Sequence, residues 1–181
     1  MKNPIELKIW EAIKDQSVYI VGSTAYSYYF QGIEPEDIDI IIEGKEEEYL
    51  ESTFDKNFLM EMKLPYSNKC NGIRLDGDGI KYDIWVEKNL NNYLNNVGLN
   101  IYAMAYNPKD GSFRCNEHFL NAMANRSIDI IDKEKMKEYI NPNHKIYEKL
   151  RRFIYNDFNL SIELENWLDE NNLRWNSQIL I

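Results

Sequence analysis

The sequence predicts an α+β fold, in which a mixed β-sheet is flanked by helices and followed by a short helical, neck-like segment. Short runs rich in Val, Ile and Tyr predict the strands, and two of the loops between them carry hairpin turn signals. Apolar residues at a helical period, near the start of the chain and from Glu117 onward, predict the helices. We expect one domain over residues 1–140 and the neck-like segment, packed on it, over residues 141–181.

The first part of the chain alternates between helices and strands. Apolar residues follow a helical period over residues 4–15, whereas residues 17–21 form a short apolar run that ends at Gly22. The aromatic stretch that follows is short, because Gly32 and the nearby Pro35 are stop signals for a helix. The expected elements are a helix over 4–15, a strand over 17–21, a helix over 24–31, a strand over 38–42, a helix over 45–53 and a strand over 56–64.

Two hairpins and a helical region complete the expected order. Residues 71–86 hold two β-rich runs around a turn at residues 76–79, and residues 101–115 hold a second pair around residues 107–111. The chain from Glu117 onward then reads mainly as helix. Its last two helices are expected near residues 144–156 and 161–172, after a break at Asn141, Pro142 and Asn143.

The charge balance limits the partners of the protein. Its 181 residues include 30 acidic and 21 basic side chains, and the formal charge of −9 opposes nonspecific binding of nucleic acid over most of the surface. Any contact with nucleic acid is therefore expected to be local. The richest basic strip is equally compatible with an ordinary solvated helix face. This basic strip consists of Lys145, Lys149, Arg151 and Arg152.

Other composition features exclude several classes of protein. The two cysteines lie far apart and only two histidines are present, so the sequence supports neither a disulfide framework nor a zinc site. No apolar run is long enough to cross a bilayer, and the amphipathic start does not have the pattern of a signal peptide. We expect a soluble, cytoplasmic protein without membrane contact, of unknown oligomeric state.

Two aspartates interrupt an otherwise apolar strand. Side chains alternate across a strand, so Asp37 and Asp39 share one face while Ile38 and Ile40 point to the other. Two like-charged carboxylates on one face are unfavourable unless they are solvated or neutralised, and a divalent cation is a common neutralising partner. The pair therefore indicates a Mg²⁺ site, with Mn²⁺ as an alternative ion, although an exposed strand edge has the same pattern.

A glycine-serine turn precedes these aspartates. The order strand, Gly22, Ser23 and helix places backbone N–H groups where a phosphate can bind, because glycine permits close approach and Ser23 adds a hydroxyl donor. An ordinary helix start with Ser23 as its N-cap has the same sequence. A phosphate site beside a metal site predicts a nucleoside triphosphate ligand.

A third acid lies in the first hairpin. Asp83 alternates with apolar residues, so it is a lone acid on one face of its strand. If this strand pairs with the strand of Asp37 and Asp39, the three carboxylates could hold two Mg²⁺ ions for nucleotidyl transfer, with Asp83 as general base. A solvent-facing acid at the end of a hairpin is the alternative.

This order of elements resembles the DNA polymerase β-type nucleotidyltransferase superfamily, in which the turn contacts the nucleotide and the acids bind the metals. The stretches VGSTAYSYYFQGIEPEDIDIII and LNIYAMAYNPKDGSF are similar to two motifs in the head domain of tRNA CCA-adding enzymes and poly(A) polymerases. The stretch YEKLRRFIYNDFNLSIE faintly resembles their base-reading helix and keeps Arg151. The resemblance implies a nucleotidyltransferase head domain over residues 1–140, catalytic and metal-binding roles for Asp37 and Asp39, and nucleotide contacts from Gly22, Ser23 and Arg151.

The chain departs from that family at several positions. An Arg-Asp pair of the family is replaced by Tyr26 and Ser27, and an Arg-Arg-Asp stretch is replaced by residues 96–98. The resemblance therefore carries the metal chemistry but not the triphosphate clamp or the selection of C and A. The role of Asp83 comes from the wider superfamily pattern.

The predicted function is transfer of a nucleoside monophosphate from an NTP to an acceptor hydroxyl, with release of pyrophosphate. The family implies tRNA or another RNA 3′ end as the acceptor, reached through the basic strip. The acidic composition favours a small molecule or a protein hydroxyl instead. The alternative function is a catalytically weak head domain that binds nucleotide or a partner, because the clamp residues are missing.

Overall fold

The computed structural model describes most of the chain. The description covers residues 3–27, 30, 37–45, 48–54, 72–77, 79–138, 145–154 and 156–173. The strand expected over residues 56–64 and the break expected at residues 141–143 lie outside these ranges.

The chain divides into two compact units. The first contains residues 1–95 and 104–116, and the second contains residues 96–103 and 117–181. The residues at which the chain passes from one unit to the other differ from the boundary expected after residue 140. The assignment of a head domain and a neck-like segment therefore stays a prediction.

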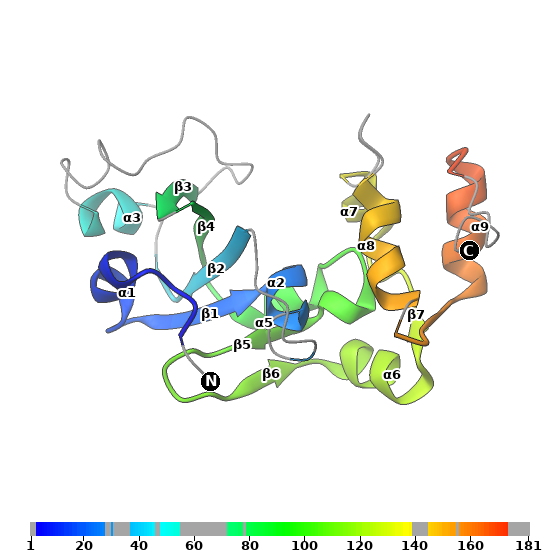
Figure 1. The fold of residues 1–181 in the computed structure, drawn as a ribbon, viewed down its shortest axis with the longest axis horizontal. Coiled ribbons are helices and arrows are strands. Elements are labelled where there is room, and N and C mark those ends of the chain that lie inside the picture. Colours follow the sequence, from blue (N-terminus) through cyan, green and yellow to red (C-terminus); the bar gives the residue numbers. More distant parts are fainter. Residues whose placement is uncertain are drawn as a thin grey trace. The chain divides into compact units, whose positions relative to one another are not determined.

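The first unit is built on a six-stranded mixed sheet, in the order β3-β4-β2-β1-β5-β6 (Figure 1). Strands β2 and β4 run parallel, whereas every other neighbouring pair is antiparallel. Both expected hairpins form, as β3 with β4 and β5 with β6. In sequence order the strands are β1 (Ser17–Val21), β2 (Asp37–Glu43), β3 (Gly72–Gly77), β4 (Ile80–Glu87), β5 (Met104–Tyr106) and β6 (Phe113–Cys115).

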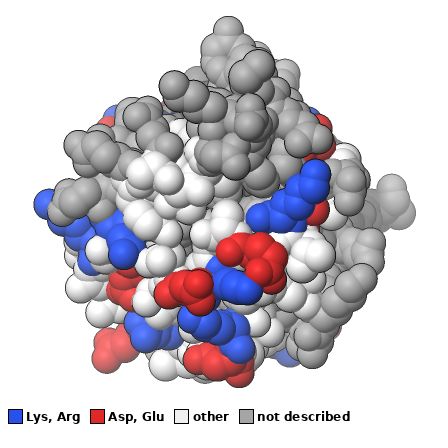
Figure 2. All heavy atoms as spheres, turned by 90° about the vertical axis from the view of Figure 1, so that its left-hand side faces the viewer, with Lys and Arg blue, Asp and Glu red and all other residues white. Residues whose placement is uncertain are grey.

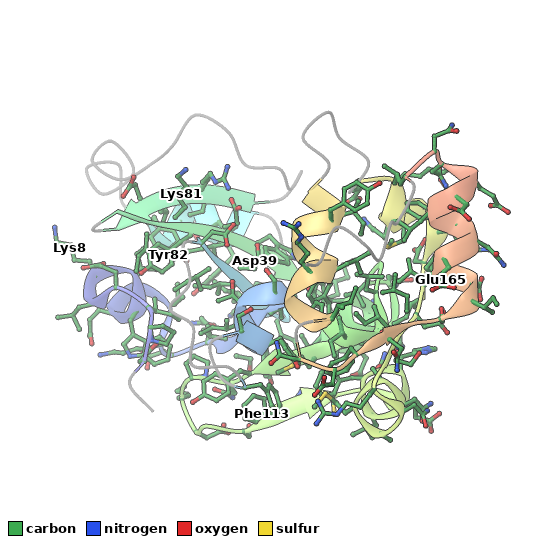
Figure 3. The ribbon with its side chains drawn as sticks, turned by 45° about the vertical axis from the view of Figure 1, so that its right-hand side comes forward. Lys8, Asp39, Lys81, Tyr82, Phe113 and Glu165 are labelled. Carbon is green, nitrogen blue, oxygen red and sulfur yellow. The ribbon has the colours of Figure 1, made fainter. Side chains whose placement is uncertain are left out.

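One face of this sheet is apolar along its whole described length. Ile38, Ile40 and Ile42 of β2 point to it and are fully buried. The start of α1 (Leu7–Ile13) is fixed to the same face, because the hydroxyl of Tyr82 accepts a hydrogen bond from Glu6 N at 3.1 Å and donates one to Pro4 O at 3.3 Å. Because neighbouring side chains of a strand point to opposite faces, Lys81 projects from the other side of β4 than Tyr82 (Figure 3).

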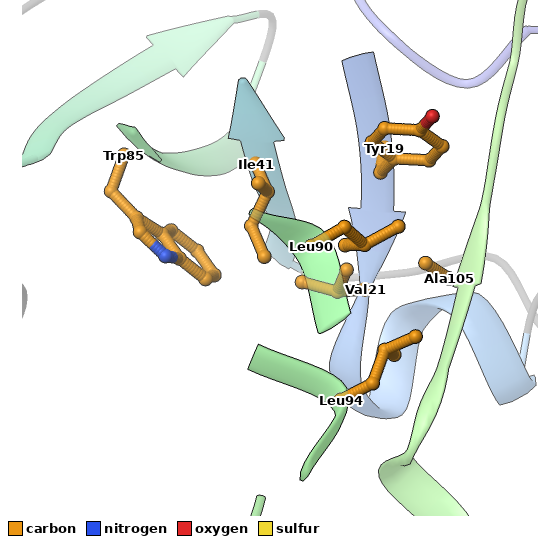
Figure 4. Close-up of a cluster of buried hydrophobic side chains, with 7 residues drawn as sticks. All are labelled: Tyr19, Val21, Ile41, Trp85, Leu90, Leu94 and Ala105. Carbon is orange, nitrogen blue, oxygen red and sulfur yellow. The ribbon is translucent and has the colours of Figure 1, made fainter. Parts of the chain in front are cut away.

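The other face is apolar only in part. Leu90 and Leu94 of α5 (Leu90–Asn95) pack on it and close a buried cluster (Figure 4). The carboxylate of Glu43 fixes the start of this helix by accepting a hydrogen bond from Leu90 N at 2.8 Å. Burial of each leucine contributes about 1.5–3 kcal/mol. The strands supply the other members of the cluster, which are Tyr19, Val21, Ile41, Trp85 and Ala105.

Two short helices precede and follow β2 along the chain. Helix α2 (Gly22–Tyr26) begins directly after β1, two residues before the expected helix start at residue 24, since Gly22 itself enters the helix after the extended Val21. Helix α3 (Glu48–Thr53) lies within the helix expected over residues 45–53. Both helices are short, and the other two helices of this unit, α1 and α5, add Ile9, Ile13, Leu90 and Leu94 to its described core.

The second unit is mainly helical, as expected, but it also contains a small parallel strand pair that the sequence did not predict. The side chain of the buried Asn100 organises its centre, since it donates to Ser127 O and accepts from Asp129 N, both at 3.0 Å. The elements are η2 (Asn100–Tyr102), α6 (Glu117–Asn125), β7 (Ser127–Ile128), α7 (Lys133–Lys137), α8 (Lys145–Ile154), β8 (Asn159–Leu160) and α9 (Ile162–Glu170). Within the described residues, no helix combines the length and apolar character needed to cross a membrane.

Candidate active site

A row of polar residues crosses one half of the sheet on the face that carries α5. The strand register aligns Arg74 of β3 with Asp83 of β4, and Asp83 with Asp39 of β2. Residues aligned across neighbouring strands point to the same face, and the strands are about 4.8 Å apart. The row continues through Val21, Ala105 and Arg114. The structure therefore brings Asp39 and Asp83 to adjacent positions, as the sequence predicted.

A second polar row lies beside the first, nearer the start of β2. Asp37 is aligned with Lys81 of β4, and Lys81 with Asp76 of β3. Asp37 is exposed and Asp39 is half-buried, whereas the isoleucines between and beyond them are buried. This alternation confirms that the two aspartates share one face. A cation that binds them would reach the site from solvent.

The turn at Gly22 meets the carboxylate of Asp39 directly. A Cβ atom placed on Gly22 would lie 2.9 Å from Asp39 Oδ2 and 3.8 Å from the hydroxyl of Tyr93. The φ angle of Gly22 is +70°, a left-handed conformation that glycine adopts at no steric cost. Gly22 therefore permits both the turn and the close approach of the carboxylate, and Asp39 lies beside the predicted phosphate-binding turn (Figure 3).

Helix α2 is tied to the aspartate strand by a hydrogen bond. The hydroxyl of the buried Thr24 donates to Asp37 O at 2.8 Å. The neighbouring Ser23 is half-buried, and helix α2 has no side-chain cap at its start. This finding excludes the alternative in which Ser23 is simply the N-cap. Sequence reasoning missed Thr24, since its partner lies 13 residues away along the chain.

Asp83 has a basic partner that sequence reasoning also missed. Arg74 Nη2 donates to Asp83 Oδ2 at 3.0 Å, and the two side chains are 23% and 11% exposed. A charge-assisted hydrogen bond of this kind is stronger than one between neutral groups. The signal was ambiguous, because residues 76–79 hold two Asp-Gly pairs, and position 74 is aligned with position 83 only when the hairpin closes at the second, with Gly77 beside Ile80.

The expected cluster of three carboxylates does not form in the described structure. No group of three or more His, Cys, Asp and Glu side chains in this part of the chain is arranged to hold a metal ion. Asp83 instead forms an ion pair with Arg74. The remaining donors, Asp37 and Asp39, still fit Mg²⁺ chemically, because this ion is commonly held by one or two carboxylates together with substrate phosphates.

At the two positions where the resembled family has an Arg-Asp pair, this chain has side chains that pack in its interior. Tyr26 and Ser27 are both buried, and the Tyr26 ring stacks on Phe30 with ring centroids 5.4 Å apart. Neither side chain is accessible to a triphosphate. The missing clamp residues are therefore not restored at these positions.

The remaining predicted contact residues lie in the second unit. Arg151 is exposed on α8, but the side chains of Lys145, Lys149 and Arg152 lie outside the described part of the chain. A basic surface made by the whole strip therefore stays a prediction. On the face drawn in Figure 2, basic and acidic side chains alternate among the described residues.

The fold matches that of solved tRNA nucleotidyltransferases. The CCA-adding enzyme of Bacillus stearothermophilus in complex with CTP has a TM-score of 0.65 at 20% identity, over 94% of this chain and 44% of that chain. The CCA-adding enzyme of Thermotoga maritima complexed with tRNA has a TM-score of 0.61 at 22% identity, over 92% and 42% of the two chains. A tRNA nucleotidyltransferase complexed with a primer tRNA and an incoming ATP analogue has a TM-score of 0.60 at 20% identity, over 92% and 49%.

These similarities confirm the expected α+β nucleotidyltransferase fold. The chain spans less than half the length of each of these three structures. No protein-family model and no curated protein matches the sequence.

Proposed function

We propose that the protein is a metal-dependent nucleotidyltransferase, which moves a nucleoside monophosphate from an NTP to an acceptor hydroxyl. The observation that carries this proposal is the contact between Gly22 and Asp39, since it joins a turn suited to phosphate with an acidic pair suited to a cation. The shared fold supports the same chemistry, because solved neighbours include complexes with CTP and with an ATP analogue.

In this proposal each residue of the site has a defined task. The turn at Gly22 and the hydroxyl of Ser23 bind phosphate oxygens of the NTP, and Asp37 and Asp39 hold Mg²⁺ or Mn²⁺. When bound, this ion neutralises negative charge on the phosphates. The acceptor hydroxyl loses its proton towards Asp39 and attacks the α-phosphorus. A new P–O bond forms, the bond between the α- and β-phosphates breaks, and pyrophosphate leaves.

Asp39 is proposed as the proton acceptor because it lies beside the Gly22 turn, where the phosphates of the NTP would bind. The sequence indicated Asp83 as general base, but Asp83 already accepts a charge-assisted hydrogen bond from Arg74. Asp83 is therefore proposed as a positioning residue for Arg74 rather than as the general base.

An RNA 3′ end is the first acceptor to test, because two of the solved neighbours are complexed with tRNA. Arg151 and the rest of the basic strip would contact such an RNA. The formal charge of −9 favours a local contact of this kind over a long RNA-binding surface.

The test follows label from each α-labelled NTP into total tRNA and into a cell extract, with Mg²⁺ or Mn²⁺ present. We expect label transfer by the wild type and a large loss in Asp37→Asn and Asp39→Asn. The matched control is Asp169→Asn, which removes an exposed acid from α9 and should transfer normally. Equal transfer by wild type and Asp37→Asn would contradict the metal-ligand role, and the labelled species would identify the acceptor.

A second function is favoured by one observation, the burial of Tyr26 and Ser27 at the clamp positions. A head domain without this clamp could bind nucleotide without transferring it. Binding of a fluorescent NTP analogue, measured beside the transfer assay, separates the two functions. Binding that depends on Asp37 but is accompanied by no transfer to any acceptor would favour the binding module.

A further inference from the structure

The ion pair between Arg74 and Asp83 is a fixed part of the polar face rather than a surface contact. Its two charged atoms are 3.0 Å apart, and Asp83 is almost buried. Arg74 Nε is buried as well and makes no hydrogen bond within the described residues. Shielded charges of this kind are only weakly screened by salt. The pair therefore holds a guanidinium group at a defined place in the site.

This guanidinium lies in the same row as the proposed metal ligands. Arg74, Asp83 and Asp39 follow one another on three adjacent strands, so the positive charge is two strands away from Asp39. Over these three strands the two polar rows carry four aspartates against one arginine and one lysine, which leaves an excess of two negative charges. One divalent cation would neutralise this excess.

We propose that Arg74 takes the place of a second metal ion, so that the site binds a single divalent cation at Asp37 and Asp39. This inference rests on the proposed nucleotidyltransferase function. A second cation on Asp83 would lie close to the like charge of Arg74, and Oδ1, the Asp83 oxygen that Arg74 does not bond, is buried. Asp83 therefore positions Arg74 instead of binding metal.

Arg74 can act on the substrate directly. Its side chain is 23% exposed, and a guanidinium has five N–H donors, of which one group is directed to Asp83. The rigid fork of the remaining donors matches the oxygens of a phosphate. Arg74 would thus supply, from the β3–β4 hairpin, the positive charge that Tyr26 and Ser27 on and beside α2 cannot supply.

The test counts Mn²⁺ ions by electron paramagnetic resonance, with one equivalent of a nonhydrolysable ATP analogue per chain. We expect one bound Mn²⁺ per wild-type chain and loss of at least tenfold in affinity in Asp37→Asn. Arg74→Met should raise the count to two, because it removes the like charge and the hydrogen bond that Arg74 places at Asp83. The double variant Arg74→Met/Asp83→Asn should return to one.

Two further variants separate a change of charge from a change of fold. Arg74→Lys keeps the positive charge and should bind one Mn²⁺, whereas Arg74→Gln is neutral, can still hydrogen bond to Asp83, and should bind the second ion if Arg74→Met does not fold. Circular dichroism checks the fold of each variant. Two Mn²⁺ ions on the wild type, or one on both neutral variants, would overturn this inference while leaving the proposed function intact. Equal Mn²⁺ binding by wild type and Asp37→Asn would instead overturn the metal site and the proposed function with it.

Discussion

The close approach of Gly22 to Asp39 makes Gly22→Ala the most informative single substitution. Alanine would adopt the φ angle of +70° only with strain, at a cost of about 1–2 kcal/mol in the free energy of unfolding. Its Cβ would also meet Asp39 Oδ2 at 2.9 Å. Relief of this contact requires the carboxylate to move by roughly 0.5 Å, which exceeds the ~0.2 Å tolerance of a metal-ligand distance.

A matched control separates the two effects. Gly44 follows the other end of β2 with a φ angle of +78°, and a Cβ placed there would meet no atom within 4 Å. Gly44→Ala should therefore lose similar stability, measured by urea unfolding, but keep its affinity for Mn²⁺. Gly22→Ala should bind Mn²⁺ about 10–100-fold more weakly, as is typical when a group that orients a ligand is changed.

The comparison of the two alanine variants has a clear refuting result. If they bind Mn²⁺ with the same affinity as the wild type, then displacement of the Asp39 carboxylate does not affect the metal. Asp39 would in that case not be a ligand, and the proposed joining of turn and acidic pair would be wrong. If both variants lose affinity equally, backbone strain at the substituted glycines rather than the contact between Gly22 and Asp39 would be the cause.

Two other predictions concern stability. Thr24→Val removes the hydrogen bond to Asp37 O and should lower the free energy of unfolding by about 1 kcal/mol. Thr24→Ser keeps the hydroxyl and should recover part of this loss. Equal urea midpoints for Thr24→Val and the wild type would show that this hydrogen bond contributes nothing to stability. Burial is the main cause that raises the pKa of Tyr19 above its usual value of 10.0, so the folded state keeps its proton where the unfolded state releases it. The resulting stability is fully present below pH 10 and is lost as the pH rises through the folded-state pKa. Tyr19→Phe should reduce this loss between pH 9 and pH 11, and an unchanged loss would assign it to other groups.

The strands and the shared face of the aspartates were predictable, because they depend on neighbours along the chain. Residues 17–21 form β1 with the expected bounds, and alternation alone placed Asp37 and Asp39 together. The placement of Asp83 beside Asp39 required the further assumption that β4 pairs with β2, which the structure confirms. The fold class followed from these elements and from the resemblance.

The features that sequence reasoning missed depend on contacts between distant residues. Thr24 and its acceptor are separated by a segment that has no period to read, and β7 and β8 are two-residue strands that pair across 32 positions. The two units could not be predicted for the same reason, since residues 96–103 pack with the chain beyond residue 117 rather than with their neighbours. Composition and period describe segments, whereas these features depend on tertiary packing.

The positive charge available for a triphosphate lies on different elements from those that the resemblance implied. Tyr26 and Ser27 are buried, so α2 and its end offer the backbone and Ser23 but no cation. Arg74 and Lys81 instead bring two cations to the polar rows from the β3–β4 hairpin, opposite the acids that would hold the metal. An inactive binding module would need only enough charge to hold a nucleotide. Catalysis additionally needs charge that stabilises the transition state more than the bound substrate. Loss of transfer with retained nucleotide binding in Arg74→Met would therefore assign Arg74 to the reaction, whereas parallel loss of both would limit it to binding.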